Sequence, residues 1–377
     1  MGYVKIGRLQ NNYMIYHIYW GTSGNSGLYT DEIYKLLEKE GYKQRVFVNF
    51  YFPFDYGDKI FFRKGDIANS KYTGLARKLF QLQETLCGFL KIIYCAFRQK
   101  PKIVNFSHVG SSYFFTYLFL KFLKYLSKTK LVITCHDVMP LSLGPRSQNE
   151  MKYRSKIFHI ADFLLVHNRN SILELHINFD INKNKILFHP FPIMDLTKMP
   201  PRTKRNFTSV DFLFIGHLRK SKGIELLLEA WKDFYRINSN AKLRVCGKQP
   251  ENVSFDKKQL ENCGVEFDLR FIDDDDYYYY VKAARYVIFP YLLGTNSGVI
   301  STVLSLGTSV ITSDLPMFKE NELINSDDMF KTGNKQSLIN KLNEKYYKNA
   351  KHSEDKVTSY REKFNIQTIN VYKQLYK

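Results

Sequence analysis

Short apolar segments rich in β-branched and aromatic residues alternate with amphipathic helical segments, and this pattern runs through the chain twice. The expected strands of the first run are Tyr13–Tyr19, Gln44–Asn49, Ile103–Phe106, Leu131–Cys135, Phe163–His167 and Lys185–Phe188, and its expected helices are Leu28–Glu40, Gly74–Arg98, Tyr113–Leu126, Gln148–His159 and Ser171–His176. Helical crossovers bring each strand back in the same direction, so the strands pair in parallel. The first half is therefore predicted to form a doubly wound parallel α/β sheet.

A segment without either periodicity separates the two runs. Residues Asp195–Phe207 (DLTKMPPRTKRNF) contain two prolines and four cations, which is typical of a linker. After it come the expected strands Val210–Ile215, Lys242–Val245, Val265–Ile272, Tyr286–Phe289 and Ser309–Thr312, and the expected helices Gly223–Tyr235, Asp275–Ala284, Val299–Leu306, Asn334–Lys345 and Ser353–Lys377. With 377 residues, the chain suits two domains facing a central cleft. We predict an N-terminal domain over 1–195, a linker over 196–208, a C-terminal domain over 209–355, and a helix over 356–377 that returns to the N-terminal domain.

Positive charge is concentrated in the first half. The formal net charge is +20, and residues 1–205 hold 31 Lys and Arg against 14 Asp and Glu, whereas residues 206–377 hold 25 against 22. Such a chain attracts nucleic acid, an anionic membrane surface or a phosphorylated ligand. The cations do not form one short run and no nucleic-acid motif is present, so we expect no nucleic-acid partner.

The cysteines and the apolar segments indicate the compartment. Five cysteines are scattered without any C-x-x-C pair, which argues against a disulfide framework or a zinc knuckle and favours a reducing compartment. The first residues show no secretory signal pattern, and cations interrupt the longest apolar stretch, near Tyr113–Leu126. A cytoplasmic protein without a spanning helix is expected.

Two loops in the second half suit a phosphate. In FIGHLRKSKG (Phe214–Gly223) a strand ends before Gly216, and Arg219 and Lys222 precede the next helix, where backbone N–H groups are exposed. In PYLLGTNSGVISTVLSL (Pro290–Leu306) the polar run Asn296–Gly298 stands directly before a helix, with Ser297 as the expected N-cap. The alternatives are a solvated basic loop and an ordinary capped helix.

The order FIGHLRKSKGIELLLEAW, RVCGK, RFIDDDDYYYYVKAARYVIFPY and TNSGVISTVLSLGTSVITSDLPMFKE resembles the donor-binding domain of family 4 glycosyltransferases, which have the GT-B fold. The similarity covers Val210–Glu320. It is looser in the first half, through GTSGNSG, LVITCHDVMPL, ADFLLVHNRNS and KILFHPFP. The resemblance implies two Rossmann-like domains and transfer of a sugar, with retention of configuration, from a nucleotide-diphosphate sugar to a glycan acceptor. The acceptor is expected to be lipid-linked, in cell-surface polysaccharide or glycolipid assembly.

The resemblance also implies roles for matching residues. In the family an Arg and a Lys on the loop after the first strand of the C-terminal domain bind the donor diphosphate, and Arg219 and Lys222 match them. The Ser-Gly amides that hold the donor phosphates match Ser297 and Gly298. The other expected donor contacts are Gly216, Gly247, Tyr291, Asn296, Val299 and Thr302.

Other positions depart from the family pattern. His217 stands where many members have Arg, and Gly294 and Thr302 stand where members often have two acidic residues that contact the sugar and ribose. Glu320 is acidic, as is the residue at the matching position of many family members. Because the paired carboxylates are missing, neither the donor base nor the donor sugar is assigned.

Departure of a nucleotide diphosphate needs positive charge but no metal. We interpret Asp273–Asp276 as the acidic start of a helix rather than a metal site, and no H-x-x-x-H pattern occurs. Metal-independent catalysis without a cofactor is therefore expected. His136 and Asp137, directly after an expected strand, are the candidate catalytic groups near the anomeric carbon, with a simple strand-end turn as the alternative.

The acceptor is expected on the basic N-terminal domain. Its candidate residues are Gly24, Asn25, Ser26 and Gly27 of the loop GTSGNSG, and His108 at the end of another expected strand. The alternative for this loop is an ordinary glycine turn in which Ser26 caps the helix. A nucleotide-sugar epimerase and a non-catalytic protein of the same fold are the other functions considered.

The expected helices Gly74–Arg98 and Tyr113–Leu126 mix apolar and aromatic residues with cations. This composition suits contact with an anionic membrane, and it also suits core helices with cationic outer faces. We expect a peripheral protein at the inner face of the plasma membrane.

Overall fold

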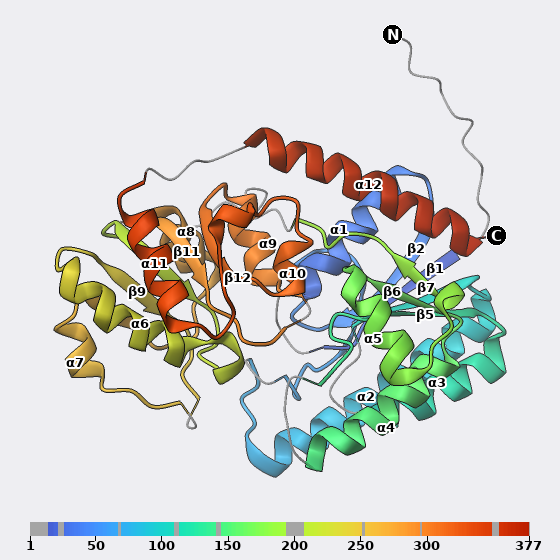
Figure 1. Ribbon diagram of the computed structural model, residues 1–377. Helices are drawn as coiled ribbons and strands as arrows, with labels where there is room; N and C mark the ends of the chain where they lie inside the picture. Colours follow the sequence, from blue (N-terminus) through green and yellow to red (C-terminus); the bar gives the residue numbers. More distant parts are fainter. Residues whose placement is uncertain are drawn as a thin grey trace, which may run out of the picture. The chain divides into compact units, whose positions relative to one another are not determined.

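The computed structural model describes residues 14–21, 26–66, 69–108, 113–140, 145–193, 207–250, 253–294, 296–348 and 354–376 (Figure 1). The chain divides into two compact units. The N-terminal unit consists of Met1–Pro190 and Phe364–Lys377, and the C-terminal unit of Phe191–Lys363. The predicted linker over 196–208 lies almost entirely outside the described residues.

The N-terminal unit is built on a seven-stranded sheet in the order β3-β2-β1-β4-β5-β6-β7, and all its strand pairs are parallel. The strands are β1 (Met14–Tyr19), β2 (Lys43–Asn49), β3 (Asp58–Phe61), β4 (Ile103–His108), β5 (Lys130–Thr134), β6 (Phe163–Val166) and β7 (Ile186–Phe188). The helices are α1 (Ser26–Lys39), α2 (Gly74–Gln99), α3 (Tyr113–Ser127), α4 (Pro145–Ile160), α5 (Arg169–Phe179) and the 3-10 turn η1 (Lys183–Lys185).

Helix α12 (Glu354–Tyr376) contributes its C-terminal part to the N-terminal unit. Asn105 Nδ2 of β4 donates to Tyr372 Oη at 3.0 Å, and the ring of Tyr376 lies 5.0 Å from that of Tyr42. Tyr372 and Tyr376 of α12 are both buried. The end of the chain therefore completes the core of a sheet formed at its beginning.

The C-terminal unit has a six-stranded parallel sheet in the order β10-β9-β8-β11-β12-β13. The strands are β8 (Val210–Ile215), β9 (Leu243–Cys246), β10 (Val265–Asp268), β11 (Ala284–Phe289), β12 (Ser309–Ser313) and β13 (Met329–Phe330). The helical segments are η3 (Lys220–Lys222), α6 (Ile224–Ile237), α7 (Lys257–Glu261), α8 (Asp274–Ala283), α9 (Gly298–Ser305), α10 (Pro316–Lys319), η4 (Ser326–Asp328) and α11 (Lys335–Tyr346).

Each sheet reverses its strand order at one place, between β1 and β4 in the first and between β8 and β11 in the second. In doubly wound sheets the loops at the carboxyl ends of the two strands flanking such a reversal diverge and leave room for a ligand. The glycine loop after β1 and the end of β4 flank the first reversal, and the loops after β8 and β11 flank the second. The topology thus selects the same loops that the sequence predicted.

The predicted fold class, with doubly wound parallel sheets, is confirmed, and most element boundaries agree within a few residues. Among the described residues, four short strands or helices were missed, β3, α7, α10 and β13, together with the 3-10 turns η1, η3 and η4. The expected strand Val265–Ile272 ends at Asp268 because its partner β9 ends at Cys246, the residue opposite Asp268. The unit boundaries fall between residues 190 and 191 and within α12. None of the described helices is both long and apolar enough to cross a membrane.

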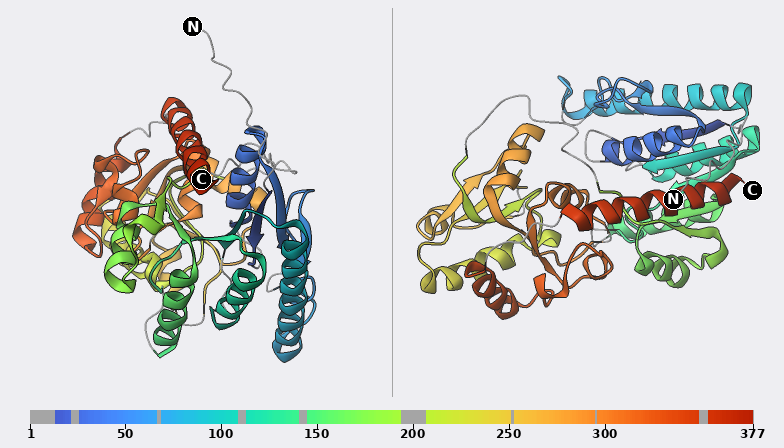
Figure 2. Two further views of the ribbon diagram at one scale, coloured as in Figure 1. Left: turned by 90° about the vertical axis from the view of Figure 1, so that its right-hand side faces the viewer. Right: turned by 90° about the horizontal axis from the view of Figure 1, so that it is seen from above.

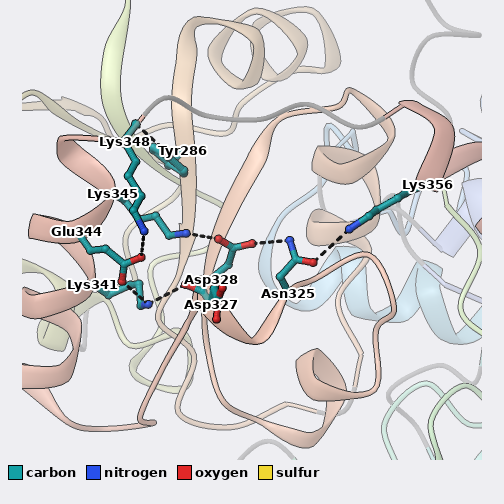
Figure 3. A network of polar contacts seen from close by, with 9 residues as sticks. All are labelled: Tyr286, Asn325, Asp327, Asp328, Lys341, Glu344, Lys345, Lys348 and Lys356. Carbon is teal, nitrogen blue, oxygen red and sulfur yellow. Dashed lines mark hydrogen bonds and ion pairs between the residues drawn. The ribbon is translucent and has the colours of Figure 1, made fainter.

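A network of lysines and carboxylates joins α11 to the edge of the C-terminal sheet (Figure 3). Lys345 Nζ is paired with Asp328, and Lys341 Nζ donates to the backbone oxygen of Asp327 at 2.7 Å. Hydrogen bonds from Lys341 and Lys348 lower the pKa of Glu344 to about 2. These lysines are held by partners within the unit, so we assign them to packing rather than to ligand binding.

Acid should destabilise the N-terminal unit, because it buries neutral histidines. His17 of β1 is fully buried, its Nε2 donates to Gln44 Oε1 at 2.9 Å, and burial lowers its pKa to about 4. In the unfolded chain His17 becomes protonated near pH 6.5, whereas in the folded protein it becomes protonated only near pH 4. The buried neutral His17 therefore makes its full contribution to the free energy of unfolding above pH 6.5. As the pH falls towards 4, that free energy decreases by on the order of 3 kcal/mol.

The test is urea unfolding at pH 7 and at pH 4.5 for wild type and His17→Phe. The variant should lose about 2 kcal/mol less than wild type between the two pH values. His159→Phe, at an exposed position of α4, is the matched control and should retain the wild-type dependence. An unchanged pH dependence in His17→Phe would contradict the assignment.

Candidate functional site

Two loops of the C-terminal unit meet at the carboxyl edge of its sheet. One joins β8 to α6 and the other joins β11 to α9. The backbone N–H groups of Leu292 and Leu293 donate to Ser221 O at 2.9 and 3.2 Å. A Cβ at Gly216 would lie 4.0 Å from Val299 Cγ2, at the start of α9. The loop containing Arg219 and Lys222 therefore lies directly against the loop that leads to Ser297 and Gly298.

Glycines make this approach possible. Gly223 has a φ of +67° and serves as the N-cap of α6. A Cβ placed on it would lie 1.7 Å from the carbonyl oxygen of Pro290, far inside van der Waals contact. Gly247, after β9, has a φ of +135°, and its Cβ would lie 1.8 Å from the oxygen of Gly216. At both positions a side chain would separate neighbouring loops of the site.

Cations gather on the first loop. The Lys222 ammonium lies over the ring of Tyr291, 3.6 Å from its centroid, which fixes the side chain against the second loop. Arg219 is exposed at the N-cap of η3. Desolvation and then the charges of Arg219, Lys248 and Lys222 lower the pKa of His217. Besides burial, the neighbouring cations therefore oppose a further positive charge on His217.

The start of α9 presents backbone donors beside these cations. Ser297 occupies the predicted N-cap position, but its side chain makes no capping hydrogen bond. Its Oγ lies instead 3.3 Å from the hydroxyl of Tyr291, the residue that also contacts Lys222. The predicted cap is therefore correct in position and wrong in its side-chain contact. The first-turn amides of Gly298 and Val299 are not capped by Ser297 and point from a helix N-terminus, where anions are favoured.

Gly294 and Thr302 stand at the two positions where family members often have carboxylates, and their surroundings differ. A Cβ at Gly294 would meet Met317 Sδ at 3.2 Å. Thr302 is buried, and its Oγ1 lies 2.7 Å from the hydroxyl of Tyr277, which also donates to Val299 O at 3.0 Å. Thr302 therefore takes part in internal hydrogen bonds of α8 and α9. Glu320, at the end of α10, is exposed.

Asp273–Asp276 form the start of a helix, as interpreted from the sequence. Asp273 is the N-cap of α8, and its carboxylate accepts from the N–H of Asp276 at 2.8 Å. Asp276 is buried and paired with Arg270. Among the described residues no group of three or more His, Cys, Asp or Glu side chains is arranged to hold a metal ion.

The N-terminal unit gathers three histidines at the carboxyl edge of its sheet. His136, His167 and His189 follow β5, β6 and β7, which are neighbours in the sheet. The ring centroids of His136 and His167 are 5.3 Å apart, and those of His167 and His189 are 4.7 Å apart. Tyr29 of α1 packs edge-on against His136 at 4.8 Å and lies 3.3 Å, hydroxyl to Nε2, from His189.

The histidines of this cluster are neutral. His136 Nε2 lies 2.8 Å from the backbone oxygen of Ser107, and because a carbonyl only accepts, Nε2 carries the proton. His189 Nδ1 likewise donates to Pro190 O at 2.9 Å, so its Nε2 accepts from Tyr29. Burial lowers the pKa of all three rings, that of His189 to about 4. The predicted catalytic His136 thus belongs to a packed cluster.

Asp137 lies beside a small pocket of about 80 Å³, lined by Tyr113, Thr134, Cys135, His136, Asp137 and Arg154, among others. Arg154 is buried and donates to the backbone oxygens of Asp137 and Val138, the latter at 3.1 Å. It also forms an ion pair with Glu150 at 2.6 Å. The turn that follows β5 is therefore fixed by an arginine of α4.

The predicted acceptor residues are only partly described. Gly24 and Asn25 lie outside the described residues. Ser26 begins α1, and Gly27 is buried with Phe52 as its neighbour, 3.5 Å from the position of a Cβ. The backbone of His108 ends β4, opposite Tyr19. These positions come from the two loops that flank the strand reversal of the N-terminal sheet.

Sequence reasoning missed residues that the fold brings to both sites. Lys248 follows β9 just as Arg219 and Lys222 follow β8, and this shared position after a strand was the available signal. Tyr277 carried no signal, since it lies in a run of four tyrosines. His167 and His189 each follow a strand, but their proximity depends on the order of strands in the sheet.

Residues 197–363 match the family model described as glycosyl transferases group 1. No curated protein sequence matches the chain.

Solved structures resemble the whole chain. Sucrose-phosphate synthase from Thermosynechococcus elongatus is 15% identical with a TM-score of 0.67, covering 97% of this chain and 99% of that one. Anabaena HepE in complex with UDP is 13% identical with a TM-score of 0.57, covering 97% and 96%. The lipopolysaccharide outer core galactosyltransferase WaaB is 14% identical with a TM-score of 0.59, covering 96% and 99%.

At these identities the solved structures establish the fold, while the family model covers the unit that contains the cationic loop. The chain has the GT-B fold, and its residues 197–363 match the family model of the group 1 glycosyl transferases.

Proposed function

We propose that the protein transfers a sugar from a nucleotide-diphosphate sugar to a glycan acceptor. The observation that carries the proposal is the junction of the two loops of the C-terminal unit. Lys222 rests 3.6 Å from the Tyr291 ring centroid, and the Tyr291 hydroxyl lies 3.3 Å from Ser297 Oγ, so one tyrosine connects the cationic loop to the N-terminus of α9. A diphosphate held there would meet cations on one side and helix amides on the other.

This arrangement suits the departure of a nucleotide diphosphate. As the glycosidic bond breaks, negative charge grows on the diphosphate, and preorganised cations and amides stabilise it without reorganisation. Arg219 and Lys222 are the groups proposed for this role, with Lys248 supporting the same potential. We propose that the reaction needs no metal and retains anomeric configuration, with His136 and Asp137 near the reacting carbon. Retention is supported by the family resemblance and is tested by determining the anomeric configuration of the product.

For the acceptor we propose a lipid-linked glycan in the assembly of a cell-surface polysaccharide or glycolipid. Residues 1–205 contain 31 cations and only 14 carboxylates, and this excess of positive charge supports a reaction at an anionic membrane surface facing the cytoplasm. WaaB, one of the proteins of similar fold, is a lipopolysaccharide outer core galactosyltransferase. HepE, another, was solved with UDP, which makes UDP-sugars the first donors to test.

Thermal unfolding with UDP-, GDP-, ADP- and dTDP-sugars tests the donor assignment. At least one should raise the unfolding temperature by a few degrees when its concentration is far above Kd, because it binds only the folded state. No stabilisation by any of them would overturn the proposal.

Assays with the stabilising donor then separate the possible functions. Transfer to an added glycan acceptor that continues in EDTA supports the metal-independent transferase. Conversion of the donor alone into an epimer would show the epimerase instead. Binding without reaction, across a range of lipid-linked and free glycans, would favour a non-catalytic protein.

A further inference from the structure

Helix α2 carries an apolar surface that the fold does not use. Its inner face, with Gly88, Phe89 and Ile92, is buried against the N-terminal unit. A Cβ at Gly88 would lie 2.4 Å from the ring of Phe61 on β3, so the packing is very close. A second row of apolar side chains remains in solvent: Leu75, Leu79, Leu82, Leu86, Leu90, Tyr94 and Phe97. We call this row the α2 stripe.

The exposed fractions of the α2 stripe are large, from 40% for Leu82 to 74% for Leu75, with Leu90 at 66%. Its members recur every three or four residues, about 3.7 on average, so they follow one side of a straight helix along nearly its whole length. Helix α2 lies on the outside of the N-terminal unit, where it is drawn in cyan (Figure 2). A contiguous exposed apolar row of this size is unusual for a protein surface without a partner.

Helix α3, which packs beside α2, also exposes large apolar side chains. Phe89 and Phe119 stack at 3.9 Å and hold the two helices together. Beyond this contact α3 exposes Phe122 at 59% and Tyr125 at 83%. At the other end of α2, Tyr72 is 42% exposed. Aromatic side chains of this kind are favoured at the boundary between lipid and water.

The charges beside the stripe select its partner. Helix α2 has the exposed cations Lys78 and Arg98 outside the stripe, and α3 has Lys121, whereas Lys91 of α2 is paired with Asp58 of β3 at 3.3 Å. The two helices contain a single carboxylate, Glu84, which accepts from the backbone N–H groups of Lys64 and Gly65 at 2.8 and 3.0 Å. A second copy of the chain would bring like charges together. A surface of anionic lipid would satisfy both the apolar row and the cations.

We propose that the α2 stripe, with the exposed aromatic residues of α3, is the surface by which the protein lies on an anionic membrane. The helix rests in the plane of the interface, with the stripe among the acyl chains near the headgroups and the cations at the phosphates. A lipid-linked acceptor would then reach the enzyme by lateral diffusion in the plane of the membrane. Only the statement about the lipid-linked acceptor rests on the proposed function. The membrane contact itself is tested below without measuring catalysis.

Flotation of the full chain with vesicles of phosphatidylcholine, with and without phosphatidylglycerol, measures this contact. Wild type should float with the anionic vesicles and much less with the neutral ones. The double variant Leu86→Gln/Leu90→Gln, at positions 48% and 66% exposed, should reduce the vesicle-bound fraction on the order of tenfold. Gln has nearly the helix propensity of Leu, so the helix should persist.

The matched control lies on α5 of the same unit. Leu173→Gln/Ile177→Gln changes two residues with the same spacing and similar exposure, 49% and 73%, and should float as wild type does. A second pair of variants tests the role of charge. Lys78→Gln/Arg98→Gln should weaken binding to anionic vesicles but not to neutral ones, whereas the control Lys183→Gln/Lys185→Gln on η1 should bind anionic vesicles as wild type does. Circular dichroism and the unfolding temperature confirm that each variant is folded.

Three outcomes would overturn the proposal. One is a wild-type protein that does not float with anionic vesicles. Another is an equal loss of flotation in the α2 and α5 variants. The last is a wild-type dimer, seen by analytical ultracentrifugation without lipid, that Leu86→Gln/Leu90→Gln dissociates while vesicle binding is unchanged; the stripe would then be an interface between copies. Failure of nucleotide binding would affect the proposed function alone.

Discussion

Replacing Lys222 with alanine is expected to lower sugar transfer by about 10²–10³-fold while leaving the protein folded. The ammonium lies at the junction of the two loops, over the ring of Tyr291. Charge stabilisation of the leaving diphosphate acts mainly in the transition state, so kcat should fall more than KM rises. The measurement is steady-state transfer with the donor that stabilises the protein.

Matched variants separate charge from packing. Lys222→Met keeps an aliphatic side chain against Tyr291 but removes the charge, and it should lose nearly as much activity as the alanine variant. Lys220→Ala changes a neighbouring lysine of the same turn, which is exposed and 3.8 Å from Glu225, and its activity should stay within a few-fold of wild type. Equal activity of the Lys222 variants and wild type would remove Lys222 from the site.

Gly223→Ala is expected to destabilise the C-terminal unit by more than about 3 kcal/mol, or to prevent its folding. The new Cβ would fall 1.7 Å from Pro290 O, and backbone atoms cannot rotate out of the way as a flexible side chain can. Relief of the clash would move the β8–α6 loop away from the β11–α9 loop. Any folded protein should therefore also lose nucleotide binding, measured by thermal shift beside urea unfolding.

Gly333→Ala is the matched control for backbone strain. Gly333 belongs to the same unit and has a φ of +72°, close to the +67° of Gly223, but its Cβ would meet only Leu292 Cδ2 at 3.9 Å. The alanine there should cost about 1 kcal/mol, the usual penalty for an L-residue in the left-handed region. Similar losses in both variants would show that the close approach to Pro290 does not constrain the site.

Much of the fold could be predicted because its determinants are local. The strand Val210–Ile215 was predicted with its observed bounds, since an apolar run that ends at a glycine is a clear signal. Strand β3 was missed because its sequence, DKIF, has two charged residues and lies at the sheet edge, where pairing with β2 rather than its own pattern defines it. The helix near Ser353–Lys377 was predicted from the sequence, but the contact of Tyr372 with Asn105 was not.

The candidate site was predicted in the same uneven way. Arg219, Lys222, Ser297 and Gly298 were identified because each stands in a loop directly after a strand or before a helix. The side-chain geometry was not accessible: Ser297 contacts Tyr291 instead of capping α9, and Thr302 is engaged by Tyr277. These contacts join residues on different elements, whose spacing is set by packing.

By itself, the sequence determined the alternation of strands and helices, the loops rich in glycine and cations, and the excess of positive charge before residue 205. These are properties of consecutive residues, and local periodicity and composition are sufficient to read them. Only the tertiary structure decided that β8 and β11 are neighbours, which brings Gly223 against Pro290 and Lys222 onto Tyr291. It also decided which side of α2 is buried, because a helix that is apolar on more than one side leaves that choice to the sheet beneath it.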